Sequence, residues 1–76
     1  MNTADMLIYV HPELDNKVRS QLASSVEGSI GVDCAEFDKH EHPHALMVRY
    51  DPDSIHSRQI LDKVRKIDPV ASIVGL

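Results

Sequence analysis

The stretch L-M-V-R-Y-D-P-D-S-I, residues 46–55, decides the fold. Its apolar residues Leu46, Val48 and Tyr50 occupy alternate positions, which is the period of an extended strand with one buried face. The next four residues, D-P-D-S at 51–54, all favour tight turns. The stretch therefore predicts a strand that ends at a turn, and the apolar patterns on either side of it indicate what packs against that strand.

Two amphipathic helices are predicted, one on each side of this stretch. The later helix begins near His56 or Ser57 and ends at Asp68, because a residue that precedes a proline is pushed out of the helical region. The earlier helix is expected to begin at Pro12, whose missing N–H does no harm in the first turn. In each helix, apolar residues recur at helical spacing and form one core-facing stripe. The stripes consist of Leu14, Val18, Leu22, Ala23, Val26 and Ile30 in the first helix and of Ile60, Leu61, Val64 and Ile67 in the second.

Short apolar runs predict three further strands, at 6–10, 32–38 and 70–74, and the imperfect alternation in the second of these indicates a β-bulge. The order of elements is then strand, helix, strand, strand, helix, strand. Two amphipathic helices cover one face of a sheet, and right-handed crossovers leave few arrangements. The simplest is an α+β, ferredoxin-like βαββαβ sandwich, with an antiparallel sheet in the order 4-1-3-2 and both helices on one face.

The composition is that of a small globular protein. Of the 76 residues, 42% are hydrophobic and 26% are charged, which argues against disorder. The net charge of −4 opposes nucleic-acid binding, which relies on a basic surface. The basic group Lys63, Arg65 and Lys66 is better explained as the solvated end of a helix. No apolar run approaches the roughly 20 residues that span a bilayer, and the polar N-terminus is unlike a signal peptide, so we expect a cytoplasmic protein without membrane insertion.

These residues carry a resemblance to a known family. Residues 46–55, with the pattern V-x-Y-D-P and the isoleucine after it, resemble the third strand and following turn of heavy-metal-associated (HMA) domains. Ile60 and Val64 are similar to residues of that family's second helix, and residues 70–74 to its last strand. The resemblance covers nearly the whole chain. It implies a single HMA-like domain over 1–76, similar to copper chaperones, mercury-binding proteins and P-type ATPase N-terminal domains.

The sequence departs from that family at the residues that hold its metal. HMA domains bind soft ions such as Cu(I) through the two thiolates of a G-M-x-C-x-x-C loop after the first strand, and the matching positions here are His11 and Leu14. The one cysteine, Cys34, is expected near the opposite end of the fold. It is either a small strand residue packed on or beside the sheet or a thiol with a redox or intermolecular role. One cysteine forms neither an internal disulfide nor a thiolate pair, so capture of Cu(I) or Hg(II) by a CxxC pair does not carry over.

Histidines gather instead in the turn expected between the second and third strands. The segment K-H-E-H-P-H at 39–44 has His40, His42 and His44 at alternate positions. Neutral imidazoles suit Zn(II), Cu(II) or Ni(II), and three of them with a fourth ligand fill a tetrahedral site. In the predicted fold this histidine-rich hairpin shares one end of the sandwich with His11. The predicted metal ligands are therefore His40, His42, His44 and His11, and the alternative is a polar hairpin tip whose histidines are only solvated.

The histidines leave two functions open. The first is a small soluble protein that binds or traffics a divalent metal ion and passes it to a metal transporter or a cofactor-assembly protein. The second is a degenerate HMA-like domain without metal that acts as a protein–protein interaction or regulatory module. No nucleophile motif, phosphate-binding glycine loop or H-E-x-x-H pattern is present, so no enzyme activity and no catalytic or cofactor-binding residue is predicted. Because edge strands in such a fold are open to pairing, we expect a monomer or a weak dimer.

Overall fold

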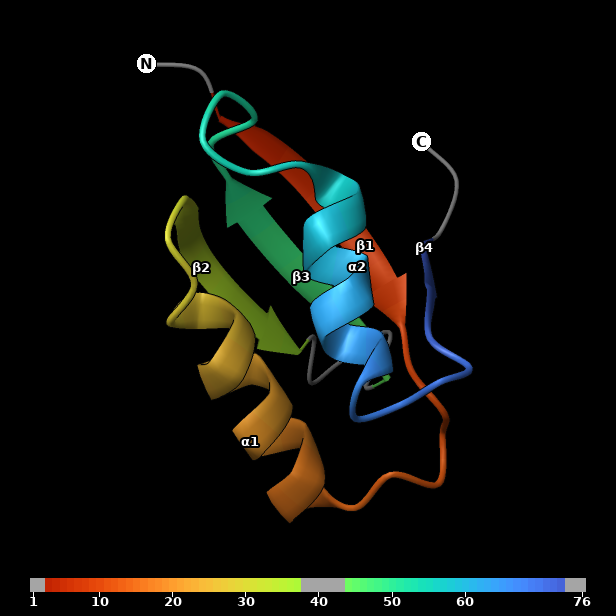
Figure 1. The fold of residues 1–76 in the computed structure, drawn as a ribbon. Coiled ribbons are helices and arrows are strands. Elements are labelled where there is room, and N and C mark those ends of the chain that lie inside the picture. The colour runs from red at the N-terminus through yellow and green to blue at the C-terminus, as the bar shows by residue number, and fades with distance from the viewer. Residues whose placement is uncertain (1–2, 38–43, 74–76) are drawn as a thin grey trace.

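The computed structural model describes residues 3–37 and 44–73. Within them the chain forms strands and helices in the predicted order (Figure 1). The elements are β1 Ala4–Tyr9, α1 Asn16–Glu27, β2 Val32–Phe37, β3 Ala45–Tyr50, α2 Ser57–Arg65 and β4 Ser72–Ile73. Neither of these helices is long and apolar enough to cross a bilayer. The predicted ends of two strands, at Asp38 and Val74, lie outside the described residues, as do His40 and His42.

The strands form one antiparallel sheet in the order β2-β3-β1-β4, which is the predicted order 4-1-3-2 counted from the other edge. β1 and β3 pair along their full length, from Ala4 opposite Tyr50 to Tyr9 opposite Ala45. The predicted bulge is present, because the pairing of β2 with β3 shifts register between Val32 and Cys34. Both helices lie on one face of this sheet (Figure 1). The α+β, ferredoxin-like prediction is therefore confirmed.

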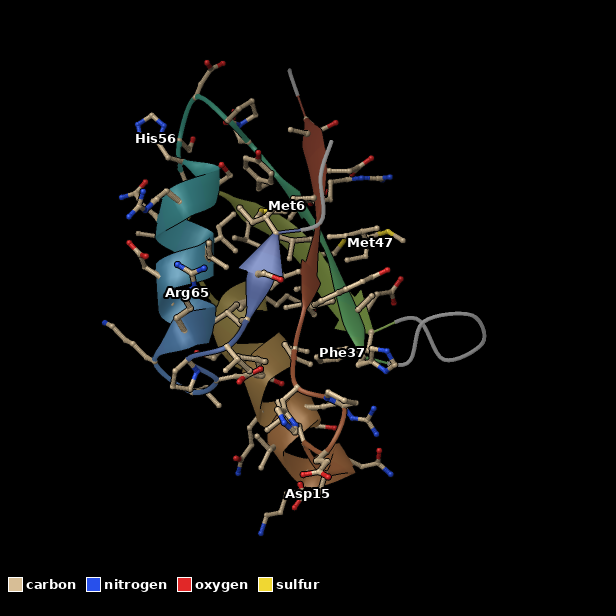
Figure 2. All side chains as sticks on the ribbon, turned by 90° about the vertical axis from the view of Figure 1, so that its right-hand side faces the viewer. Met6, Asp15, Phe37, Met47, His56 and Arg65 are labelled. Atoms are coloured by element: carbon tan, nitrogen blue, oxygen red, sulfur yellow. The ribbon has the colours of Figure 1, made fainter. Side chains whose placement is uncertain are left out.

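The alternation that predicted β3 also decides which face of the sheet is buried. Leu46, Val48 and Tyr50 are buried beneath the helices. Met47 is 42% exposed and projects from the side of the sheet that faces away from α2 (Figure 2). Full burial of a Val, Leu or Ile side chain contributes about 1.5–3 kcal/mol, so this apolar layer is the main source of stability in a short chain. It also includes Met6, Ile8, Val10, Leu22, Val26, Ala35, Ile60, Leu61, Val64 and Ala71.

Helix α1 begins at Asn16, so the prediction that it begins at Pro12 was wrong. Pro12 lies in a turn before the helix. The N-cap is Asp15, whose carboxylate accepts a hydrogen bond from the N–H of Val18 at 2.8 Å. The first N–H groups of a helix have no partner within it, and an aspartate at the N-cap satisfies one of them. The Asp15 cap therefore decides where the helix begins, although a proline is also tolerated in the first turn of a helix.

Two residues of the predicted stripes lie beyond the C-terminal ends of the helices. Ile30 follows α1 and is 91% exposed, and Ile67 follows α2 and is 42% exposed. In both cases the helix ends before the apolar pattern does, so the last residue of the pattern no longer points to the core. The second helix also ends at Arg65, before the predicted stop at Asp68. The other stripe residues are buried or half-buried, namely Leu14, Val18, Leu22, Ala23, Val26, Ile60, Leu61 and Val64.

The basic group at the end of α2 serves the fold. Lys63 and Arg65 lie in the last turn of the helix, where cations interact favourably with the helix dipole. The Lys63 ammonium donates a hydrogen bond to Oγ of Ser29 at 2.6 Å, and Nε of Arg65 donates to the carbonyl of Ala71 at 2.9 Å. These side chains join α2 to the end of the first helical segment and to the start of the last strand. The prediction of a basic helix end is confirmed.

Gly31 occupies a position where any side chain would be disfavoured. Its φ is +93°, and a methyl group on its Cα would lie 2.9 Å from Cγ2 of Ile55 and 3.0 Å from Cβ of Ser54. Because the backbone conformation and the contact both disfavour it, we expect Gly31→Ala to lower the free energy of unfolding by about 2–3 kcal/mol. Urea denaturation measures this loss.

The control for this prediction is Gly28→Ala. Gly28 has a φ of −75°, and the nearest atom to an added methyl group would be the Ser24 carbonyl oxygen at 3.4 Å. We expect that substitution to change the free energy of unfolding by no more than about 0.5 kcal/mol. Equal losses in the two variants would contradict the strain expected at Gly31.

Candidate metal centre

The loop that follows β1 is organised around His11. Its carbonyl accepts a hydrogen bond from the N–H of Leu14 at 3.1 Å, and its ring nitrogen Nδ1 accepts one from the N–H of Glu13 at 3.1 Å. The side chain of Leu14 turns inward and packs against the hydrophobic core. The loop is therefore a compact turn in which Leu14 is half-buried, whereas His11, Pro12 and Glu13 are exposed.

The hydrogen bond to Glu13 restricts what the His11 ring does as a ligand. A nitrogen that accepts a hydrogen bond carries no proton, so the neutral ring is protonated on Nε2. A metal bound at Nε2 would require the proton to move to Nδ1, where it would face the N–H of Glu13. Two donors would then oppose each other, which costs about 1–3 kcal/mol for the lost hydrogen bond. His11 is therefore poorly prepared to bind a metal in this conformation.

Asp68 joins the His11 loop to the connection between α2 and β4. It is only 4% exposed. One carboxylate oxygen, Oδ2, accepts a hydrogen bond from the N–H of His11 at 2.7 Å, and Oδ1 accepts one from the N–H of Val70 at 3.3 Å. Burial of a carboxylate is tolerated only where its oxygens are hydrogen-bonded, and here both are.

His44 lies immediately before β3, at the same end of the fold as His11. The N–H of Val10 donates a hydrogen bond to the His44 carbonyl at 3.0 Å. The His44 ring is half-buried and meets the ring of Tyr9 edge-on, with centroids 6.2 Å apart. The structure therefore brings the base of the histidine hairpin next to the loop that carries His11.

The described residues contain only part of the predicted ligand set. Of the four predicted histidines, His11 and His44 are placed, whereas His40 and His42 lie outside the described residues. Among residues 3–37 and 44–73, no three His, Cys, Asp or Glu side chains gather in a way that could hold a metal ion.

The thiol lies at the other end of the sheet, as predicted. Cys34 is an exposed free cysteine that pairs with Arg49 near the end of β3, whereas His44 precedes the start of that strand. The guanidinium of Arg49 donates a hydrogen bond to Asp5 at 3.1 Å. This bond, the charge of Asp5 and the nearby Cys34 together raise the pKa of Arg49 above its ordinary value.

His56 is also remote from the candidate site. It is the N-cap of α2, and its N–H donates a hydrogen bond to Oε1 of Gln59 at 2.8 Å. Asp15, the cap of α1, lies at the opposite end of the molecule (Figure 2). The prediction that the second helix begins near His56 or Ser57 is confirmed.

Comparison with known proteins identifies the fold. No family model and no curated protein sequence matches this chain. A copper-binding domain from HMA7, a P-type ATPase, is similar with a TM-score of 0.77 and 14% identity, over 93% of this chain and 93% of that one. The CsoZ metallochaperone gives a TM-score of 0.73 at 18% identity, over 97% and 100% of the two chains. The mercury-bound form of MerP, from a bacterial mercury detoxification system, gives 0.75 at 9% identity, over 97% and 100%.

This is the fold of heavy-metal-associated domains. The HMA fold is present here without a pair of thiolates, because the chain has a single cysteine and the structure places it at the far end of the sheet from His11. Leu14, at the second expected cysteine position, is packed against the core. Capture of Cu(I) or Hg(II) between two thiolates therefore does not fit this chain.

Proposed function

We propose that this chain is a small metal-handling protein that binds a divalent transition-metal ion through histidines. The ion is Zn(II), Cu(II) or Ni(II), and the ligands are His40, His42 and His44. The observation that carries the proposal is the 3.0 Å hydrogen bond between the N–H of Val10 and the His44 carbonyl. This bond anchors His44, at the base of a segment with three alternate histidines, against the loop of His11. The imidazoles of such a segment are suitable ligands for these ions.

We further propose that the bound ion is passed to a protein partner in the cytoplasm, either a metal transporter or a cofactor-assembly protein. Two of the similar structures support this proposal, since one is a copper-binding domain from a P-type ATPase and another is a metallochaperone. The absence of a nucleophile or phosphate-binding motif in the sequence favours a binding protein over an enzyme. The ion is then cargo that the protein carries unchanged.

The proposal is tested by adding Zn(II), Cu(II) or Ni(II) separately to the isotopically labelled chain and recording NMR spectra. We expect one ion per chain with a Kd of micromolar or tighter. With Zn(II), the signals of His44, Tyr9 and Val10 should shift until the site is saturated. With the paramagnetic ions Cu(II) and Ni(II), the same signals should broaden before others do. The signals of His56 and Cys34 should stay unchanged. If no ion binds, or if the changes centre on Cys34, the proposal is wrong. The alternative of a metal-free interaction or regulatory module would then be favoured.

His11 should contribute less to binding than the hairpin histidines. We expect His11→Ala to weaken Zn(II) binding by less than about 3-fold and His44→Ala by more than about 10-fold, because Nδ1 of His11 already accepts the N–H of Glu13. Isothermal titration of the two variants side by side measures the difference. Equal losses would mean that His11 gives up that hydrogen bond and binds as a full ligand.

A further inference from the structure

Two consecutive N–H groups at the end of β1 are held from opposite sides. The N–H of Val10 donates to the His44 carbonyl at 3.0 Å, and the N–H of His11 donates to Oδ2 of Asp68 at 2.7 Å. In an extended chain, consecutive N–H groups point in opposite directions. The first bond therefore faces the base of the hairpin, and the second faces the connection between α2 and β4.

The carboxylate of Asp68 accepts a backbone N–H just beyond the point where β1 and β4 stop pairing. β1 and β4 pair at Ile8 with Ile73 and at Tyr9 with Ser72. The N–H of His11, two residues beyond Tyr9, would be the next to point toward that neighbour, and it meets the side chain of Asp68 instead of a strand carbonyl. A side chain thus holds the first residue of the loop at the position where a further strand pair would form.

Asp68 is itself held in place, so its carboxylate is a fixed acceptor. Its N–H donates to the Val64 carbonyl at 2.9 Å, and its own carbonyl accepts from the N–H of Ala71 at 3.1 Å. Its Oδ1 accepts from the N–H of Val70 at 3.3 Å. With both carboxylate oxygens occupied and the side chain buried, Asp68 is placed to hold the loop and is not exposed to bind an ion.

We infer that Asp68 is a positioning residue for the metal site. By holding the His11 peptide on one side, it keeps the neighbouring Val10 peptide in line for its bond to the His44 carbonyl on the other. The base of the histidine hairpin is then fixed at a set place without any contact between Asp68 and the ion. This inference rests on the proposed function, because the site that it positions is the histidine site.

Asp68→Asn tests the inference with little change in shape. Asparagine retains one acceptor oxygen, but its NH2 group would face one of the two N–H donors that the carboxylate now satisfies. We expect hydrogen exchange of the His11 and Val10 amides to become at least about 10-fold faster, and the NMR signals of His44 to shift. We also expect the Kd for Zn(II) to rise about 10-fold, a typical effect of residues that orient metal ligands.

The matched control is Asp51→Asn at the opposite end of the fold. Asp51 also accepts with both oxygens, from the N–H of Asp53 at 2.9 Å and from the hydroxyl of Ser54 at 2.9 Å. This variant should leave Zn(II) affinity and the exchange of the His11 amide unchanged. A role of Asp68 in stability alone would leave Zn(II) affinity of the folded variant unchanged too, so affinity separates the two roles.

The outcomes are distinct. Unchanged exchange at His11 and Val10 in Asp68→Asn overturns the inference, and so does faster exchange with unaltered Zn(II) affinity. A wild-type chain that binds none of Zn(II), Cu(II) and Ni(II) overturns the proposed function, while the exchange rates and the His44 signals still decide whether Asp68 holds the hairpin base. If Asp68→Asn does not fold, Asp68→Glu takes its place, because it retains both acceptors and displaces them by one methylene. It should then show the same faster exchange and weaker binding.

Discussion

Alanine at His40, His42 and His44 together is expected to remove specific metal binding. The Kd for Zn(II), Cu(II) or Ni(II) should rise from micromolar or tighter to about 1 mM or weaker, a loss of about 4 kcal/mol of binding free energy. The reason is that these imidazoles are the proposed ligands, while the described part of the chain brings no three metal-binding side chains together. Isothermal titration of the wild type and the variant in one buffer measures the loss.

The triple substitution must leave the fold intact for this result to count. The His44 ring touches Tyr9 edge-on, so its removal should cost no more than about 1 kcal/mol of unfolding free energy. The control is His56→Ala, since His56 is an exposed histidine that caps α2 at the other end of the molecule. His56→Ala should bind metal like the wild type. A triple variant that binds as tightly as the wild type would show that the hairpin is not the site.

The fold could be predicted from the sequence because its signals are local. The alternation of Leu46, Val48 and Tyr50 specifies a strand and its buried face, and all three side chains are buried as expected. The element order then leaves few topologies, and the observed strand order is the simplest of these. Where prediction failed, two local signals competed. At the start of α1 the tolerance of Pro12 for a first turn competed with the capping side chain of Asp15, and the cap decided the boundary.

The site was less predictable, because its contacts join residues that are far apart in the chain. His11 and Asp68 are 57 positions apart in the chain. In the sequence, Asp68 is merely the residue before Pro69, which predicts where a helix stops and says nothing about which N–H its carboxylate accepts. The fold class did place His11 and the hairpin at one end, and the structure agrees for His44. The engagement of Nδ1 of His11 depends on a turn of three residues whose geometry no periodicity specifies.

Leu46→Ala is expected to give the largest loss of stability among the single substitutions considered, about 3–4 kcal/mol of unfolding free energy. Leu46 is fully buried, and it pairs with Ile8 of β1 on one side and with Phe37 of β2 on the other. Among the described residues, the pair with Phe37 lies at the end of the β2–β3 ladder next to His44. Truncation would leave a cavity among side chains from several elements, which cannot all move to fill it. Urea denaturation followed by circular dichroism measures the loss.

Met47→Ala is the matched control, because it removes a side chain of similar size from the adjacent position on the other face. Met47 is 42% exposed, so we expect a change of less than about 1 kcal/mol. The contrast between the neighbours tests the register of β3 directly, since a slip of one residue would exchange the buried and exposed faces along the whole strand. It would also carry His44 away from its bond to Val10. A larger loss in Met47→Ala than in Leu46→Ala would therefore contradict both the fold and the placement of the histidine hairpin.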